Sequence, residues 1–257
     1  MKLKLGLGTL LILGAVAFFL LQKRESLPQS PFNTAKPRWE FNNSTNTWQA
    51  GGTPPDCPKP LVFPSPVDTK LASSVLYPGQ VRGGDYKAHG GFRFDGLKSN
   101  EVKMYAPFDG NLIQAAQHTQ GSEVQYSLYF INDCGVMYKF DHLLELTDKF
   151  NKIMKSVPLK GEGDTRTTSI NPSVFTSKGE LIATKVGLSG NIFVDFGVYD
   201  LRHKNGVDYS TRDYFNISQY GEYGICWLNN LNEPERTIVK GLPGADGQSG
   251  KKSDYCR

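Results

Sequence analysis

Residues Lys87–Asp95 hold the first side chains whose types and spacing could do chemistry, a His, an Arg and an Asp set among glycines. His89 and Asp95 are an even number of residues apart, so an extended segment points both to one face, which Gly91 and Arg93 share. Neutral imidazole and carboxylate are both ligands of Zn²⁺. The two could equally form a hydrogen-bonded pair that shapes a turn, and a metal site requires a third ligand elsewhere.

Asp195 is the second such group, because it is an acid within an otherwise apolar stretch, Ile192–Tyr199. Burying a carboxylate without a partner is costly. Asp195 therefore needs a metal ion, Arg93 or His89 beside it. Arg93 is itself expected to form a structural ion pair with a carboxylate, or else to grip a substrate carboxylate through two hydrogen bonds.

Short strands must position these groups, because the chain is rich in Gly, Pro, Tyr and Phe and poor in long helix-forming runs. Alternating or apolar runs bounded by turn residues predict strands over 61–63, 102–106, 111–117, 124–131, 136–140, 179–186 and 192–199. This order predicts an antiparallel meander and a mainly β domain.

Helices are expected in two places. Apolar residues near helical spacing predict a helix over Leu143–Met154, with Asp141 as its N-cap. Tyr220–Leu231 is typical of a short helix. Lys155–Thr176 is expected to be a polar loop, and His118 falls in another polar loop with no predicted role.

The N-terminus carries an export signal. Leu5–Leu21 is free of charge and flanked by basic residues, and its length corresponds to about 25 Å of helix, near the short limit for a membrane span. Residues 1–24 are interpreted as an uncleaved membrane anchor that leaves the domain outside the cytoplasm, periplasmic or extracellular. A cleaved signal, with Ala15–Ala17 as its site, is the alternative.

Three further segments follow from composition. Residues 25–56 are rich in Asn, Thr, Ser and Pro and predict a flexible tether, although Trp39, Phe41 and Trp48 could instead dock on the domain. Residues 57–235 form the domain. Residues 236–257 are expected to be a flexible tail that only Cys256 ties down.

The net charge of +4 comes entirely from the N-terminal segment. Residues 1–24 contain four basic residues and no acid, so the remaining 25 basic residues balance the 25 acidic ones. A neutral domain offers no electrostatic case for nucleic-acid binding, and no such partner is expected.

The four cysteines have no metal-binding or redox-active spacing. Behind an export signal they predict two disulfides, with free buried thiols as the alternative. Three pairings are possible. The favoured one joins Cys57 to Cys134 and Cys226 to Cys256, because Cys57 and Cys256 bracket the domain and each would tie down a terminus.

The order of the short sequence motifs along the chain also bears on the fold and the function. After the His/Asp stretch come Tyr105–Gly110 (Tyr-Ala-Pro-Phe-Asp-Gly), Asp141–Leu143 (Asp-His-Leu), Lys178–Ala183 (Lys-Gly-Glu-Leu-Ile-Ala) with Val186–Gly187, and a strand with a central acid. Over roughly 77–200 this order resembles the LytM-type domain of the M23 peptidases, zinc endopeptidases that act on peptidoglycan cross-bridges. The resemblance implies a LytM-like antiparallel β-sandwich of the duplicated hybrid motif kind, with short helices.

The resemblance also implies a site. The family has a His and an Asp four residues apart and a late His-x-His, whose second His completes the zinc ligands while a water fills the open position. Carried over, it makes His89, Asp95 and Asp195 the metal ligands, Zn²⁺ the cofactor and His142 the catalytic residue, with Arg93 as a substrate-binding candidate. The carry-over is incomplete.

Two positions depart from the family. Four residues before Asp95 stands Gly91, so His89 could reach the ligand place only through a bulge. The first His of His-x-His is replaced by Phe193, which cannot transfer a proton.

The leading expectation is an envelope protein that carries a degenerate M23-like domain, binds peptidoglycan or another cell-wall polymer, and meets the membrane through its N-terminal helix. An active zinc endopeptidase is the alternative and would bring His89, Asp95 and Asp195 to one point. A metal-free carbohydrate- or peptide-binding module is the third reading and predicts an aromatic-lined cleft away from these residues.

Overall fold

The computed structural model describes residues 38–209 and 219–257, all within one compact unit, Lys36–Arg257. The anchor expected over residues 1–24, and with it the membrane contact, lies outside the described residues. Within the described ranges, no helix is long and apolar enough to cross a membrane.

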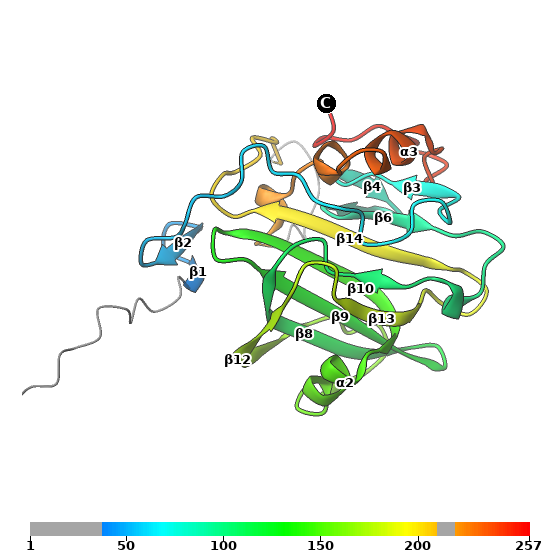
Figure 1. Cartoon of the computed structure of the whole chain (residues 1–257), viewed down its shortest axis with the longest axis horizontal. Helices are drawn as coiled ribbons and strands as arrows, with labels where there is room; N and C mark the ends of the chain where they lie inside the picture. The colour runs from blue at the N-terminus through cyan, green and yellow to red at the C-terminus, as the bar shows by residue number, and fades with distance from the viewer. Residues whose placement is uncertain (1–37, 210–218) are drawn as a thin grey trace, which may run out of the picture. The chain divides into compact units, whose positions relative to one another are not determined.

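The central sheet contains ten of the described strands (Figure 1). They are β3 (Ser74–Leu76), β6 (Gly90–Arg93), β7 (Met104–Tyr105), β8 (Gly110–Gln120), β9 (Glu123–Ile131), β10 (Val136–Leu146), β11 (Leu159–Lys160), β12 (Thr168–Thr176), β13 (Leu181–Val186) and β14 (Phe193–Asp200). Their order is β11-β8-β9-β10-β14-β6-β3, with β12 added to β8 and β13 bridging β10 and β7. The mainly β class and the meander of β8, β9 and β10 are confirmed.

Two segments have a different secondary structure from the one predicted. Residues 61–63 form no strand of their own, and Phe63 makes only an isolated bridge to Leu231. The segment predicted as a polar loop, Lys155–Thr176, contributes β11 and β12 to the sheet edge. Most residues of β12 are exposed or only partly buried on both faces of the strand, so its sequence carries little alternation of apolar and polar residues.

The long strands have one apolar and one polar face, as the alternation of side chains requires. The apolar face holds fully buried Phe92, Leu128, Phe130, Phe140, Val194 and Phe196. The opposite face carries His118, Ser127, Lys139, Asp141 and Asp195, which line a common pocket. The polar side chains are therefore spread over four neighbouring strands, β8, β9, β10 and β14.

The predicted helix over Leu143–Met154 is wrong in its first turn. Residues up to Leu146 belong to β10, and the helix α2 covers Asp148–Met154 with Thr147 at its N-cap. The other helical segments among the described residues are η1 (Ser99–Glu101), η2 (Gly221–Tyr223), η3 (Trp227–Asn230) and α3 (Glu235–Gly241). Asp141 is thus not a cap but a strand residue, which makes it available to the polar face.

Residues 38–51 form a docked hairpin rather than a tether. β1 (Arg38–Asn42) pairs with β2 (Thr47–Gly51), and a second hairpin, β4 (Gln80–Arg82) and β5 (Asp85–Lys87), precedes β6. Trp48 is buried, stacks on Tyr220 with ring centroids 5.2 Å apart, and packs edge-on against Phe41. The alternative reading, in which the aromatic residues dock on the domain, holds for this part of the segment.

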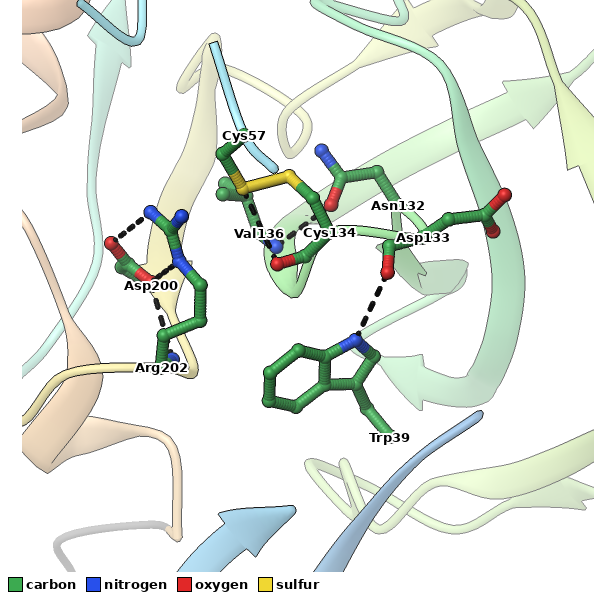
Figure 2. The surroundings of a disulfide bond; sticks show 8 residues. All are labelled: Trp39, Cys57, Asn132, Asp133, Cys134, Val136, Asp200 and Arg202. Carbon is green, nitrogen blue, oxygen red and sulfur yellow. Dashed lines mark hydrogen bonds and ion pairs between the residues drawn. A yellow bond between two sulfur atoms is a disulfide. The ribbon is translucent and has the colours of Figure 1, made fainter. Parts of the chain in front are cut away.

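Both disulfides have the favoured pairing, Cys57–Cys134 and Cys226–Cys256. Figure 2 shows the first beside Trp39, whose indole N–H donates to the carbonyl oxygen of Asp133 at 3.3 Å. Because disulfides persist in oxidising compartments, the pair indicates an environment other than the cytoplasm.

The segment after Gly241 is ordered, in contrast to the predicted flexible tail. Ala245 donates its backbone N–H to Val75, and the side-chain amide of Gln80 donates to the carbonyls of Gly250 and Lys252. These hydrogen bonds give the polar segment partners that its composition does not reveal.

We predict that the double variant Cys226→Ser, Cys256→Ser loosens this C-terminal segment. The disulfide closes a loop between residues 30 apart, and losing such a constraint costs about 3–4 kcal/mol of unfolding free energy in the chain-entropy account. Urea unfolding and carboxypeptidase digestion should show lower stability and trimming beyond residue 241. The matched variant Cys57→Ser, Cys134→Ser should lose stability yet keep its C-terminus protected; equal trimming in both would contradict this assignment.

Candidate metal and ligand-binding pocket

Two carboxylates face each other at the centre of the polar face. Asp141 of β10 is in register with Asp195 of β14, and Asp195 lies opposite Gly91 of β6. A Cβ atom on Gly91 would lie 2.3 Å from the carbonyl oxygen of Val194, so a side chain there would push β6 away from Asp195.

His142 lies at an irregularity in β10. The pairing of β10 with β9 shifts register between Phe140 and Leu143, and His142 adopts a positive φ of 63°. This φ costs a non-glycine residue free energy, and such residues cluster at functional sites. The shift allows both Asp141 and His142 to line the pocket while Leu143 returns to the core.

His89 is the nearest partner of Asp195. Its Nε2 lies 2.9 Å from Asp195 Oδ2, whereas His142 Nε2 lies 3.7 Å from the same oxygen. The guanidinium of Arg82 donates to the carbonyl oxygen of His89 at 2.9 Å and so holds the backbone of the loop between β5 and β6. The predicted need of Asp195 for a partner is met by His89.

Lys139 is the partner of Asp141. Its Nζ lies 2.5 Å from Asp141 Oδ2 and 3.4 Å from the hydroxyl of Tyr129, and only 8% of the residue is exposed. A lysine is buried to this degree only when its charge is compensated. The ammonium group is therefore a fixed part of the pocket.

Charge and burial act in opposite directions on the pKa of each group. Burial alone would raise the pKa of Asp195, but the adjacent imidazole of His89, its hydrogen bond and the charge of Arg82 lower it below the ordinary value. Burial lowers the pKa of His89, and the charge of Asp195 only partly opposes this. The consistent state is an ionised Asp195 that accepts a hydrogen bond from a neutral His89.

The second pair is a full ion pair. Burial favours neutral Lys139, but the charge of Asp141 and the nearby Tyr129 raise the pKa of the lysine well above its usual value. Burial likewise raises the pKa of Asp141, but the charge of Lys139, the nearby His89 and the hydrogen bond from Lys139 together lower it below the ordinary value. Lys139 is thus charged and Asp141 ionised at neutral pH.

His89, Asp141 and Asp195 could hold a metal ion. Each offers a ligand atom within 4.8 Å of the others. Zn²⁺ bonds of about 2.1 Å in tetrahedral geometry place ligand atoms about 3.4 Å apart. His89 Nε2 and Asp195 Oδ2, now 2.9 Å apart, would have to separate slightly, and any wider pair of ligand atoms would have to come closer. The donor set of one imidazole and two carboxylates suits several divalent cations and does not select zinc.

The surrounding His/Asp pocket, as we name it, has a volume of about 470 Å³ and is lined by Arg82, His89, His118, Gln120, Ser127, Tyr129, Lys139, Asp141, His142, Phe193 and Asp195, among others. Within the described part of the chain, Nδ1 of His118, Nδ1 of His142 and Oγ of Ser127 have no hydrogen-bond partner although each is buried. Buried polar groups normally have partners. These three atoms therefore lack, within the described residues, the partner that their burial calls for.

Several lining residues were missed by sequence reasoning, among them Lys139, His118 and Asp141. His118, assigned no role, lies in β8 and is 3% exposed; Asp141 was assigned to a helix cap. The alternation of β8 and β9 as two long paired strands, with His118 opposite Gln125, is the signal that would have placed His118 on the polar face.

Asp95 and Arg93 do not join the pocket. Asp95 accepts a hydrogen bond from Ser73 at 2.8 Å and lies 3.5 Å from Arg93, whose guanidinium also donates to Asn191 at 3.0 Å. The predicted ligand set is therefore corrected, because Asp141 stands where Asp95 was expected. Six extended residues span about 20 Å, so His89 and Asp95 can share a face without meeting.

Comparisons with protein-family profiles, curated proteins and solved structures return no match for this chain. What the pocket can do must therefore be inferred from its own residues.

We predict that the free energy of unfolding decreases as the pH is lowered, because the pocket histidines resist protonation in the folded state. Burial lowers the pKa of His118, which the charge of Asp141 only partly offsets, and burial lowers that of His89. The folded chain then binds fewer protons than the unfolded chain, whose imidazoles titrate near about pH 6.5. The contribution is complete above that pH and is lost as the pH falls through the lowered pKa values.

Urea unfolding at a series of pH values between about 7.5 and 5 tests this. His118→Asn should make the decline shallower, whereas His203→Asn, at an exposed position, should leave it unchanged. An identical pH profile for wild type and His118→Asn would refute the assignment.

Proposed function

We propose that this protein is a cell-envelope binding protein with a LytM-like domain whose His/Asp pocket recognises peptidoglycan or a related cell-wall polymer without cleaving it. The observation that carries the proposal is that both pocket carboxylates already have partners, Asp141 with Lys139 and Asp195 with His89. The pocket is a charge-compensated, open cavity with unpartnered buried donors and acceptors.

Lys139 opposes metal binding at this place. A cation bound between Asp141 and Asp195 would have to displace the ammonium group, and a buried charge left without its partner costs about 3–5 kcal/mol. Two cations beside Asp141 would repel each other, and this repulsion is stronger next to buried groups than in bulk water. Lys139 therefore supplies the compensating charge that a metal would otherwise supply.

The pocket also lacks a complete set of residues for proton transfer. Phe193 occupies the position at which the LytM-type family has its first late histidine, and its ring contacts His142 with centroids 4.3 Å apart. His142 is the remaining candidate for a proton carrier near Asp195. One histidine against an aromatic ring supports recognition better than hydrolysis.

The compartment supports the same proposal. The two disulfides indicate an oxidising environment, and the apolar N-terminal run is typical of an exported chain. Cell-wall polymers are found in that environment.

We predict that the full chain sediments with purified peptidoglycan sacculi and that Gln120→Trp weakens this several-fold. Gln120 lines the pocket at the end of β8 and has no side-chain hydrogen bond in the described part of the chain, so an indole there would fill space without disturbing the ion pairs. The measurement is the fraction of protein retained by sacculi after washing.

Gln120→Ser is the matched control, since it changes the same residue without filling the pocket, and it should keep wild-type retention. Equal retention of Gln120→Trp and wild type would remove the pocket from the interaction. No retention of wild type would overturn the proposed function.

A zinc endopeptidase is the second candidate, because His89, Asp141 and Asp195 converge closely enough to hold an ion. We predict that Lys139→Met raises zinc affinity at least about tenfold over wild type, since it removes a charge-assisted hydrogen bond of about 1.5–3 kcal/mol that competes for Asp141. Zinc titration by calorimetry measures the change.

Lys185→Met is the matched control. Lys185 also lies 2.5 Å from a carboxylate, that of Glu145, but this pair is exposed and outside the pocket. Wild-type protein that binds one zinc tightly and digests sacculi would replace the binding proposal with the peptidase. Zinc affinity unaffected by Lys139→Met would refute the role given to Lys139.

A further inference from the structure

A second cavity lies between the β1–β2 hairpin and the strands β8 and β12, away from the His/Asp pocket. Its volume is about 390 Å³, and its walls include Trp39, Trp48, Gln114, Asn132 and Asp133. We name it the hairpin cavity. None of these residues lines the His/Asp pocket.

The amide side chains of this cavity are oriented by the protein. Gln114 Oε1 accepts hydrogen bonds from the hydroxyl of Tyr220 at 2.9 Å and from that of Thr167 at 3.3 Å. Asn132 Oδ1 accepts from the backbone N–H of Val136 at 2.8 Å. With both oxygens engaged, the NH₂ groups of these amides remain as donors.

Asp133 supplies the matching acceptors. Its side chain has one polar partner in the described part of the chain, Asn111, at a long 3.4 Å. Arg38 and Glu40, at the cavity rim, pair with each other at 3.1 Å and are largely exposed. Apart from this exposed pair, the described walls of the cavity carry one carboxylate, that of Asp133, and no cation, which disfavours an anionic ligand.

Trp39 supplies an apolar surface. Its ring lies against Gly135, where an added Cβ atom would be 2.4 Å from the indole, and its N–H is bound to the carbonyl of Asp133. Figure 2 shows the ring next to the loop that carries Asn132 and Asp133. The indole of Trp39 is held in place and only partly buried, while Trp48, which also lines the cavity, packs against Tyr220.

We propose that the hairpin cavity binds a neutral saccharide. Each sugar hydroxyl both donates and accepts, which suits fixed amide donors beside a carboxylate acceptor. The C–H face of a pyranose suits the negative face of an indole ring. This site goes beyond the proposed function, because it uses none of the residues of the His/Asp pocket.

Calorimetric titration of the full chain with chitotetraose and cellotetraose tests the proposal, in a detergent without a sugar head group. We expect at least one to bind with a Kd of about 1 mM or tighter. Asp133→Asn should weaken binding about tenfold, because a hydrogen bond to a charged group is lost. Trp39→Leu should weaken it further, with circular dichroism reporting whether the hairpin remains folded.

Asp148→Asn is the matched control, since it removes the same charge from an exposed position on α2, and it should bind as wild type does. Gln120→Trp should also keep saccharide affinity, which separates this site from the His/Asp pocket. The proposal is overturned if neither saccharide binds at about 10 mM, if tetra-alanine binds equally well, or if Gln120→Trp abolishes binding.

Discussion

The registration of Asp141 against Asp195 is the constraint on which the polar face depends. Like charges directly opposite each other on neighbouring strands destabilise a sheet, and here both are largely buried. Each needs its own hydrogen-bonded or charged neighbour. Lys139, two residues before Asp141 on the same face, and His89, in the loop before β6, fulfil this need. The glycine opposite Asp195 and the arginine that holds the loop keep His89 within reach.

Much of the fold could be predicted from local pattern, and much of the site could not. Alternation located β8, β9, β13 and β14, and the positions of the cysteines favoured the observed disulfides. The extent of β10 was missed because residues 143–154 also have near-helical spacing, and tertiary pairing with β13 overrides it up to Leu146. That one boundary decided whether Asp141 was interpreted as a cap or as a site residue.

The error at Asp95 has a different cause. Alternation predicts which face of a strand a side chain occupies, but it does not show which side chains of that face lie close enough to bind the same ion. Asp95 was chosen because it was matched to the Asp of the LytM-type spacing. Counted from His89, the position four residues on is Arg93, which is in register with Phe193 of β14. Arg93 and Phe193 therefore lie side by side on neighbouring strands.

The His/Asp pocket and the hairpin cavity are both lined by residues of β8, although they share no residue. Gln114 and His118 lie four residues apart on the same face of β8, about 13 Å along the strand. Between them the ring of Tyr129, which contacts Lys139, lies 5.9 Å from the ring of Tyr220, which bonds Gln114 and stacks on Trp48. The hairpin thus contributes to the core that supports the pocket as well as to its own cavity. Tyr220 contacts residues of both sites. Substitutions of the polar residues that line the hairpin cavity therefore separate ligand binding from stability better than substitutions of its aromatic residues.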